Sequence, residues 1–224
     1  MFWDNVAGVY DIFTNIINRK THKGLCSKVE EEISDTDEVL ECACGTGLLS
    51  GVIARKCKSL VATDFSRKML KKASKKYSAY TNVEFREGNI LQIEYPDENF
   101  DIVVAANVIH LLDEPYKALS ELDRVCRRGG KIIIPTYMNK NDKGKTSLFA
   151  NTVGKAGADF KRQFTFDTYK KFIKEAGYKN VDYSWIEGKI PCAVAVIKKI
   201  EIQKRKREYQ SCCMEDEMAL KIGI

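Results

Sequence analysis

Two stretches decide the fold of this chain: Val39-Leu40-Glu41-Cys42-Ala43-Cys44-Gly45-Thr46-Gly47-Leu48-Leu49 and Ala62-Thr63-Asp64-Phe65-Ser66. In the first, an apolar strand ends near the carboxylate of Glu41, and a glycine turn then opens a helix. In the second, another short strand ends in the carboxylate of Asp64. This order of elements is typical of a site that holds a nucleoside-containing cofactor.

Strands and helices alternate along most of the chain. The pattern predicts helices over residues 5–33, 67–78, 115–126 and 167–176, and further strands over residues 60–63, 83–86, 100–106, 131–136, 180–186 and 192–198. We expect Gly129-Gly130 to end the third of these helices. Such alternation predicts a parallel sheet with right-handed crossovers, and the last two strands predict an antiparallel hairpin.

Length and charge set broad limits. The 224 residues are 44% hydrophobic, which allows one sizeable core, and the net charge is +6. Much of the positive charge lies in residues 67–76 and 198–207, each of which is either a solvated segment or a contact for an acidic surface, nucleic acid or lipid head groups. No apolar run approaches the roughly 20 residues of a membrane span, and the first residues lack a secretory signal. We therefore expect a cytoplasmic protein.

Eight cysteines are present without a secretion signal, which argues against a disulfide framework. Cys42 and Cys44 lie inside the glycine turn, but no Cys-x-x-Cys partner or nearby histidine completes a metal site. We expect small buried thiols and no bound metal. Cys212 and Cys213 lie in the polar tail and have no evident role.

Polar side chains follow four predicted strands at the point where each ends: Glu41, Asp64, Asn89 and Asn107. In a doubly wound sheet, ligands bind beyond the carboxyl ends of the strands, so we expect these groups to converge on one crevice. Asp64 lies near the spacing of about 20 residues after the turn that is expected of a ribose-binding acid.

The residues around the turn favour S-adenosylmethionine over a dinucleotide. A dinucleotide fingerprint needs a third glycine, and here that position is Ser50. Glu41 places negative charge beside the turn, which disfavours a phosphate and suits a cationic amine. The predicted closing hairpin also replaces the second mononucleotide-binding half that a dinucleotide fold requires.

Residues 1–198 resemble the class I S-adenosylmethionine-dependent methyltransferases, and most of all the small-molecule branch that includes quinone and phospholipid-head-group methyltransferases. The matching motifs lie in residues 41–47, at Asp64, in Gly88-Asn89-Ile90, in residues 100–112, and in residues 121–125 and 128–131. The resemblance implies an α/β fold with a doubly wound, Rossmann-like sheet of seven strands, mostly parallel, with an antiparallel strand in the C-terminal hairpin. It also implies methyl transfer to a small molecule.

By resemblance, a set of residues binds the cofactor: Glu41, Ala43, Gly45, Gly47, Asp64, Phe65, Met69, Gly88, Asn89, Ile90, Asn107 and Val108. Two of them depart from the family pattern, since Ala43 replaces a frequent glycine and Asn89 a frequent aspartate. The amide oxygen of Asn89 can still accept a hydrogen bond from the exocyclic amine of adenine.

The implied reaction is direct displacement of the methyl group from a sulfonium, for which the protein mainly aligns donor and acceptor. A base is needed only for an acceptor that is protonated at neutral pH. His110 is the candidate base, and Tyr10 resembles an aromatic residue that covers the donor; the alternative for each is a packing role. Trp3 and Tyr137 are candidates for the acceptor pocket.

The expected organisation is an N-terminal helical cap (1–36), a methyltransferase domain (37–198) with a lid-like insertion (137–164), and a basic tail (199–224). Three other functions stay open: a nucleic-acid methyltransferase, a non-catalytic S-adenosylmethionine-binding protein and a nicotinamide oxidoreductase. Against the first, residues 107–110 lack the Asn/Asp-Pro-Pro-Tyr motif of enzymes that methylate bases. The acceptor atom and the oligomeric state cannot be read from the sequence. Peripheral contact with a membrane or another acidic surface is assigned to the tail.

Overall fold

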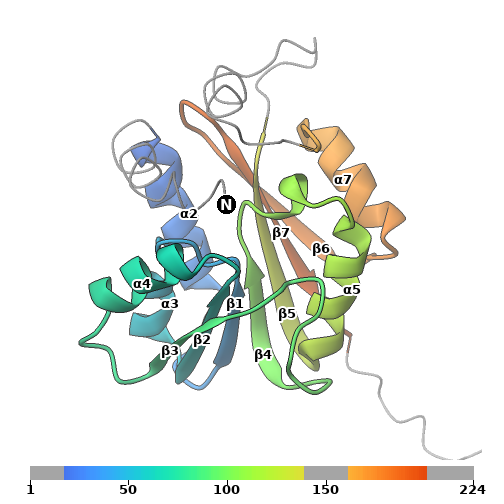
Figure 1. The fold of residues 1–224 in the computed structure, drawn as a ribbon. Coiled ribbons are helices and arrows are strands. Elements are labelled where there is room, and N and C mark those ends of the chain that lie inside the picture. Colours follow the sequence, from blue (N-terminus) through green and yellow to red (C-terminus); the bar gives the residue numbers. More distant parts are fainter. Residues whose placement is uncertain (1–17, 139–160, 201–224) are drawn as a thin grey trace, which may run out of the picture.

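The computed structural model describes residues 18–138 and 161–200 (Figure 1). The elements follow in the order α2 (Arg19–Glu31), β1 (Glu38–Cys42), α3 (Ser50–Lys56), β2 (Ser59–Asp64), α4 (Arg67–Lys76), β3 (Val83–Glu87), β4 (Phe100–Ala105), η2 (Ile109–Leu111), α5 (Pro115–Val125), β5 (Cys126–Tyr137), α7 (Phe166–Glu175), β6 (Val181–Ile186) and β7 (Cys192–Lys198).

The seven strands form one sheet in the order β3-β2-β1-β4-β5-β7-β6. Strands β1 to β5 pair in parallel, and β7 lies antiparallel between β5 and β6. Strands β2 and β3 are added in turn on one side of β1, and β4 pairs with β1 on its other side. The predicted doubly wound, mostly parallel sheet with an antiparallel hairpin strand is therefore confirmed, and its topological switch lies between β1 and β4.

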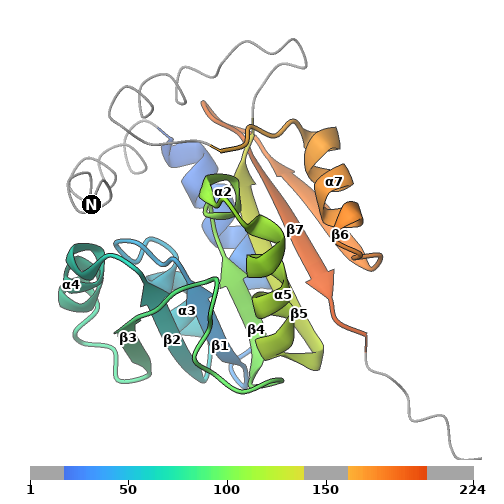
Figure 2. The ribbon, with the colours of Figure 1, turned by 45° about the vertical axis from the view of Figure 1, so that its right-hand side comes forward.

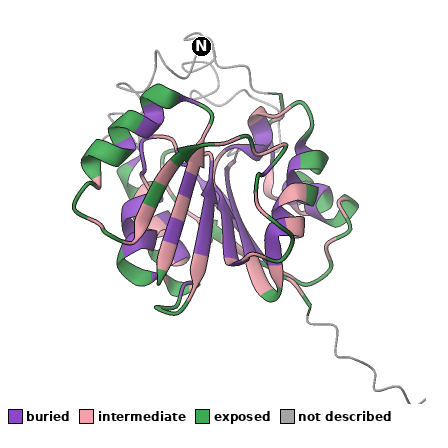
Figure 3. Ribbon diagram, turned by 60° about the horizontal axis from the view of Figure 1, so that its bottom comes forward, coloured by how far each residue is buried: buried purple, intermediate pink, exposed green. Residues whose placement is uncertain are grey.

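Helices cover both faces of the sheet because the central strands are apolar on both sides. Leu40 and Val103 face a core completed by α5 and α7, whereas their neighbours Val39 and Val104 face a core completed by α2, α3 and α4. Figure 3 shows the resulting buried band across the centre of the sheet. Among the described helices, none is both long and apolar enough to span a bilayer.

One prediction about the elements is wrong, and another concerns a helix that is only partly described. The pair Gly129-Gly130 does not end a helix: α5 ends at Val125, and both glycines lie inside β5. Glycine is required there because a side chain on Gly130 would meet the backbone oxygen of Asp101, where the β4–β5 register shifts. Of the predicted helix 5–33, only the part from residue 18 onward is described, and α2 accounts for it.

The thiols of Cys42 and Cys44 are buried, as expected from the sequence. Cys42 is 1% exposed and Cys44 is 7% exposed, and both are free. Burial raises the pKa of both thiols, so neither is a thiolate near neutral pH. Within residues 18–138 and 161–200, no group of three His, Cys, Asp or Glu side chains is placed to hold a metal ion.

Arg124 on α5 holds the segment that connects β3 to β4. Its guanidinium donates to the backbone oxygens of Ile93 and Tyr95, each at 2.8 Å, and to the carboxylates of Asp97 and Glu121. Glu121 in turn accepts from the backbone N–H of Ile93. One half-buried side chain thus satisfies several backbone groups of an otherwise irregular segment.

We expect Arg124→Ala to lower the free energy of unfolding by about 2 kcal/mol, because it leaves the partners of a charged donor unsatisfied. The matched control is Arg128→Ala, since Arg128 is exposed and pairs only with the Glu98 side chain among the described residues; its effect should stay within about 0.5 kcal/mol. Urea unfolding followed by circular dichroism measures both. Equal effects would contradict the anchoring role of Arg124.

Candidate cofactor site

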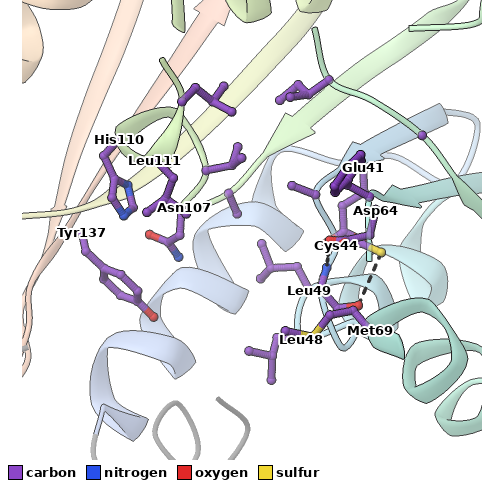
Figure 4. A pocket seen from close by; sticks show the side chains of 18 of the residues that line it. Glu41, Cys44, Leu48, Leu49, Asp64, Met69, Asn107, His110, Leu111 and Tyr137 are labelled. Atoms are coloured by element: carbon purple, nitrogen blue, oxygen red, sulfur yellow. Dashed lines mark hydrogen bonds between the residues drawn. The ribbon is translucent and has the colours of Figure 1, made fainter. Parts of the chain in front are cut away.

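A cavity of about 450 Å³ opens at the carboxyl edge of the sheet, beside the ends of β1 and β4 (Figure 4). The predicted strand-end groups Glu41, Asp64, Asn89 and Asn107 all line it. So do most of the other residues predicted to bind the cofactor: Ala43, Gly45, Phe65, Met69, Gly88, Ile90 and Val108. The convergence expected from the sequence is therefore present, and the role of each residue toward a cofactor stays a prediction.

Gly47 is the predicted cofactor residue that does not line the cavity. Its φ is +78°, and a Cβ atom there would lie 2.7 Å from the ring of Tyr77, which follows α4. Gly51 meets the same ring. Gly47 is thus needed for close packing between the turn and α4, and its part in cofactor binding stays a prediction.

Gly45 and Ala43 shape the turn itself. Gly45 has a φ of +57°, and open space surrounds the position of a Cβ atom, so this residue leaves room at the cavity wall. Ala43 adopts a φ of +55°, which costs a non-glycine residue roughly 1 kcal/mol. Strain of this kind is common where a backbone is fixed for binding.

Glu41 is a carboxyl group that lies almost out of contact with water. It is 2% exposed, and its Oε2 accepts a hydrogen bond from the Ser50 hydroxyl at 2.5 Å. Burial raises its pKa to about 8, the Ser50 hydrogen bond acts in the opposite direction, and the nearby charge of Asp64 adds to the rise. A cationic group in the cavity would favour the ionised form.

Asp64 joins the glycine turn to the end of β2. Its Oδ2 accepts from the backbone N–H of Gly45 and its Oδ1 from that of Ser66, both at 2.8 Å. Ser66 then caps α4 by accepting from the backbone N–H of Met69. A carboxylate has about four acceptor positions, and these two hydrogen bonds use two of them.

The next part of the wall is formed by Phe65 and the turn after β3. Phe65 is 57% exposed although it lines the cavity, so its ring is available to a planar group. Gly88 donates its backbone N–H to the Asp64 carbonyl at 3.1 Å. The Asn89 Oδ1 already accepts from the Leu91 N–H at 2.9 Å, which leaves this oxygen one further lone pair.

Figure 4 shows Asn107, His110 and Tyr137 on the side of the cavity opposite Glu41 and Asp64. Asn107 has a φ of +53°, and its Oδ1 is buried without a hydrogen-bond partner among the described residues. His110 is 5% exposed, and burial lowers its pKa to about 4, so the imidazole is neutral at physiological pH. A pKa this low also makes the imidazole a weak base.

Some residues of the site were missed or cannot be placed. Ser50 served only as a departure from a dinucleotide fingerprint, yet it is the hydrogen-bond partner of Glu41. His22 on α2 also lines the cavity and was not predicted. The one sequence feature that could have pointed to it is that the chain has only two histidines. Tyr10 and Trp3 lie outside the described residues, as does most of the predicted lid 137–164.

Comparison with known proteins agrees with this geometry. Residues 40–134 match a family profile described as a methyltransferase domain. The phosphatidylethanolamine N-methyltransferase of Cereibacter sphaeroides is 33% identical over 126 residues, which cover 52% of this chain and 61% of that protein. The ubiquinone/menaquinone biosynthesis C-methyltransferase UbiE of Rickettsia akari is 26% identical over 220 residues, which cover 84% of this chain and 87% of that protein.

Solved structures share the fold at low identity. A methyltransferase dependent on S-adenosylmethionine from Aquifex aeolicus has a TM-score of 0.58 at 23% identity and covers 78% of this chain and 89% of its own. The cyclase SpnF has a TM-score of 0.66 at 14% identity and covers 89% and 97%. The fold alone therefore does not define the reaction. The match of residues 40–134 to the methyltransferase profile and the similarity to the two curated methyltransferases support a class I S-adenosylmethionine-dependent methyltransferase.

Proposed function

We propose that the chain transfers the methyl group of S-adenosylmethionine to a small molecule with an apolar body. The observation that carries the proposal is that two carboxyl groups from adjacent strands, Glu41 and Asp64, line one cavity beside a glycine turn. A nucleoside with a cationic tail offers a partner for each of them. The chemistry supplied by the bound donor is the reactivity of its sulfonium.

The proposed arrangement assigns each end of the donor to a different wall. Glu41 accepts from the amine, and Asp64 accepts from the ribose hydroxyls, where a carboxylate is the strongest acceptor available. Phe65, Asn89 and Ile90 hold the adenine between a ring face, an amide and an apolar side chain. The nearly buried position of Glu41 supports its role, because a carboxyl with so little access to water gains most from a cationic partner.

An apolar acceptor is supported by the rest of the cavity lining, which is mainly aliphatic: Leu25, Leu48, Leu49, Leu91, Leu111 and Leu112. The two named relatives act on a phospholipid and in quinone biosynthesis, as their names state. We therefore propose a quinone or a phospholipid head group as the acceptor class. His110 is the proposed base if the acceptor carries a proton at neutral pH.

The domain organisation, the location and the surface contact expected from the sequence also stay proposals. The lid and the basic tail fall mostly on residues 139–160 and 201–224, which the structure does not describe, and the helical cap is described only from residue 18 onward. The cytoplasmic location and the contact of the tail with an acidic surface have the same status.

Calorimetry with S-adenosylhomocysteine tests the cofactor proposal directly. We expect Glu41→Gln to weaken binding by about 10- to 100-fold at pH 8, since a charge-assisted hydrogen bond to the amine is lost. The unfolding free energy of the empty variant should be equal to or above that of the wild type, because a buried carboxyl is replaced by a neutral amide. Glu175→Gln, an exposed change on α7, is the matched control. Binding of NADH with no binding of S-adenosylhomocysteine would refute the proposal.

The raised pKa of Glu41 predicts proton release on binding. From about pH 5 to pH 8 the unfolded carboxyl is ionised while the folded one stays protonated, so the stability of the empty protein should fall as the pH rises through this window. At pH 7, binding of the amine should release about one proton per ligand. Calorimetry in buffers of different ionisation enthalpy measures this release, which should vanish in Glu41→Gln. A wild-type binding enthalpy that is independent of buffer would contradict the assignment.

The base role predicts a loss of turnover with retained donor binding. With methyl-labelled donor and a panel of quinones and phosphatidylethanolamine, we expect His110→Asn to slow transfer by about 100-fold or more. Its affinity for S-adenosylhomocysteine should stay within about threefold of wild type. His22→Asn, the same change elsewhere on the cavity wall, is the control. Equal losses in both variants would indicate general damage to the cavity and argue against a base at His110.

A further inference from the structure

The outer face of α4 concentrates the positive charge of the molecule. The helix sequence Arg-Lys-Met-Leu-Lys-Lys-Ala-Ser-Lys-Lys contains six basic residues and no acidic one. Its apolar residues Met69, Leu70 and Ala73 pack against the protein, so all six basic side chains lie on the exposed side. For comparison, the net charge of the entire chain is +6. We call these six side chains the α4 basic face: Arg67, Lys68, Lys71, Lys72, Lys75 and Lys76.

On three other helices, at least one basic residue pairs with an acidic residue three or four positions further along or before it in the chain. Lys28 pairs with Glu32 on α2, Arg124 pairs with Glu121 on α5, and Lys171 pairs with Glu175 on α7. The α4 helix has no such pair. Its described ion pair is between Arg67 and Glu87 on β3.

The remaining lysines of the α4 basic face form no ion pair within residues 18–138 and 161–200, and Lys76 lies over the ring of Tyr77. Their spacing also opposes helix stability, because like charges recur four residues apart, as in Lys68 and Lys72 or Lys71 and Lys75. Basic residues in the first turn further oppose the helix dipole, and α4 has no acidic residue there. An external anionic surface would turn this unfavourable arrangement into a favourable one.

The α4 basic face stands beside the wall of the cavity. Phe65, just before α4, is an exposed aromatic residue that lines the cavity, and Met69 on the first turns of α4 lines it as well. In Figures 1 and 2, α4 lies on the side of the molecule away from α5 and α7. A surface bound by α4 would therefore lie next to Phe65 and the aliphatic lining described above.

We propose that the α4 basic face docks the protein on an anionic phospholipid surface, from which a lipid-dissolved acceptor enters the cavity. The choice of acceptor rests on the function proposed above. The apolar side of α4 is packed inside the protein, so the contact is electrostatic, with Phe65 at the level of the head groups. A nucleic-acid partner fits less well, because single-stranded binding surfaces interleave several basic and aromatic residues, whereas the six basic residues of α4 have one exposed aromatic ring beside them, that of Phe65.

Vesicle sedimentation of the full chain tests the proposal. We expect binding to phosphatidylcholine vesicles that contain phosphatidylglycerol, no binding to pure phosphatidylcholine, and loss of binding at about 1 M salt. The triple variant Lys71→Gln, Lys72→Gln, Lys75→Gln should bind the anionic vesicles about 100-fold more weakly. The matched triple variant on α7, Lys170→Gln, Lys171→Gln, Lys174→Gln, should bind like the wild type.

Further arms separate the alternative outcomes. A third variant with glutamine at Lys204, Arg205, Lys206 and Arg207 should keep most of the binding; loss there with retention in the α4 triple variant would overturn the proposal in favour of the tail. Equal loss in the α4 and α7 variants, or no binding of the wild type to anionic vesicles, would also overturn it. So would tighter, equally lysine-dependent binding to a single-stranded RNA. Calorimetry with S-adenosylhomocysteine on the same samples reports on the proposed function independently, since none of these lysines lines the cavity.

Discussion

The hydrogen bond from the Gly45 backbone N–H to the Asp64 carboxylate is the constraint on which the site depends. It fixes the glycine turn after β1 to the end of β2, and the second oxygen of the same carboxylate holds the start of α4 through Ser66. Three segments are therefore positioned by one side chain. Because the sheet places the ends of β1 and β2 side by side, this bond forms without distorting either strand. The hydrogen bond thus positions the part of the cavity wall that the glycine turn and the start of α4 form.

Several energetically unfavourable features gather at this wall of the cavity. Ala43 and Asn107 adopt positive φ angles, Glu41 is a buried carboxyl with a raised pKa, and the Asn107 side-chain oxygen lacks a partner among the described residues. Each of these features weakens the empty protein. They gather on two sides of one cavity, whereas the two cores beneath it are apolar and closely packed. Such a concentration of unfavourable features is what a preformed binding site requires.

The sequence predicted most of the fold because the central strands are continuous apolar runs and their ends carry polar residues. Asp64, Asn89 and Asn107 could be placed from strand ends alone. The role of Gly47 could not, since its contact with Tyr77 joins residues thirty apart in the chain that only the packed structure brings together. Gly129-Gly130 resembled a helix stop because a bulged strand and a helix end both favour glycine. The hydrogen bond from Ser50 to Glu41 was not predicted, because a sequence fingerprint records that a glycine is absent and not which hydrogen bond the serine in its place makes.

The ring of Tyr77 packs so closely against Gly47 and Gly51 that neither position has room for a side chain. This contact couples the position of α4 to that of the glycine turn, because a shift of the helix would open a void under the ring. A surface that holds the α4 basic face in place would therefore also restrain the glycine turn at the donor site. By thermodynamic reciprocity, a donor bound at the glycine turn would in turn favour the position of α4 that a surface-bound protein prefers. Tyr77 therefore couples the outer surface of α4 to the cavity inside the molecule.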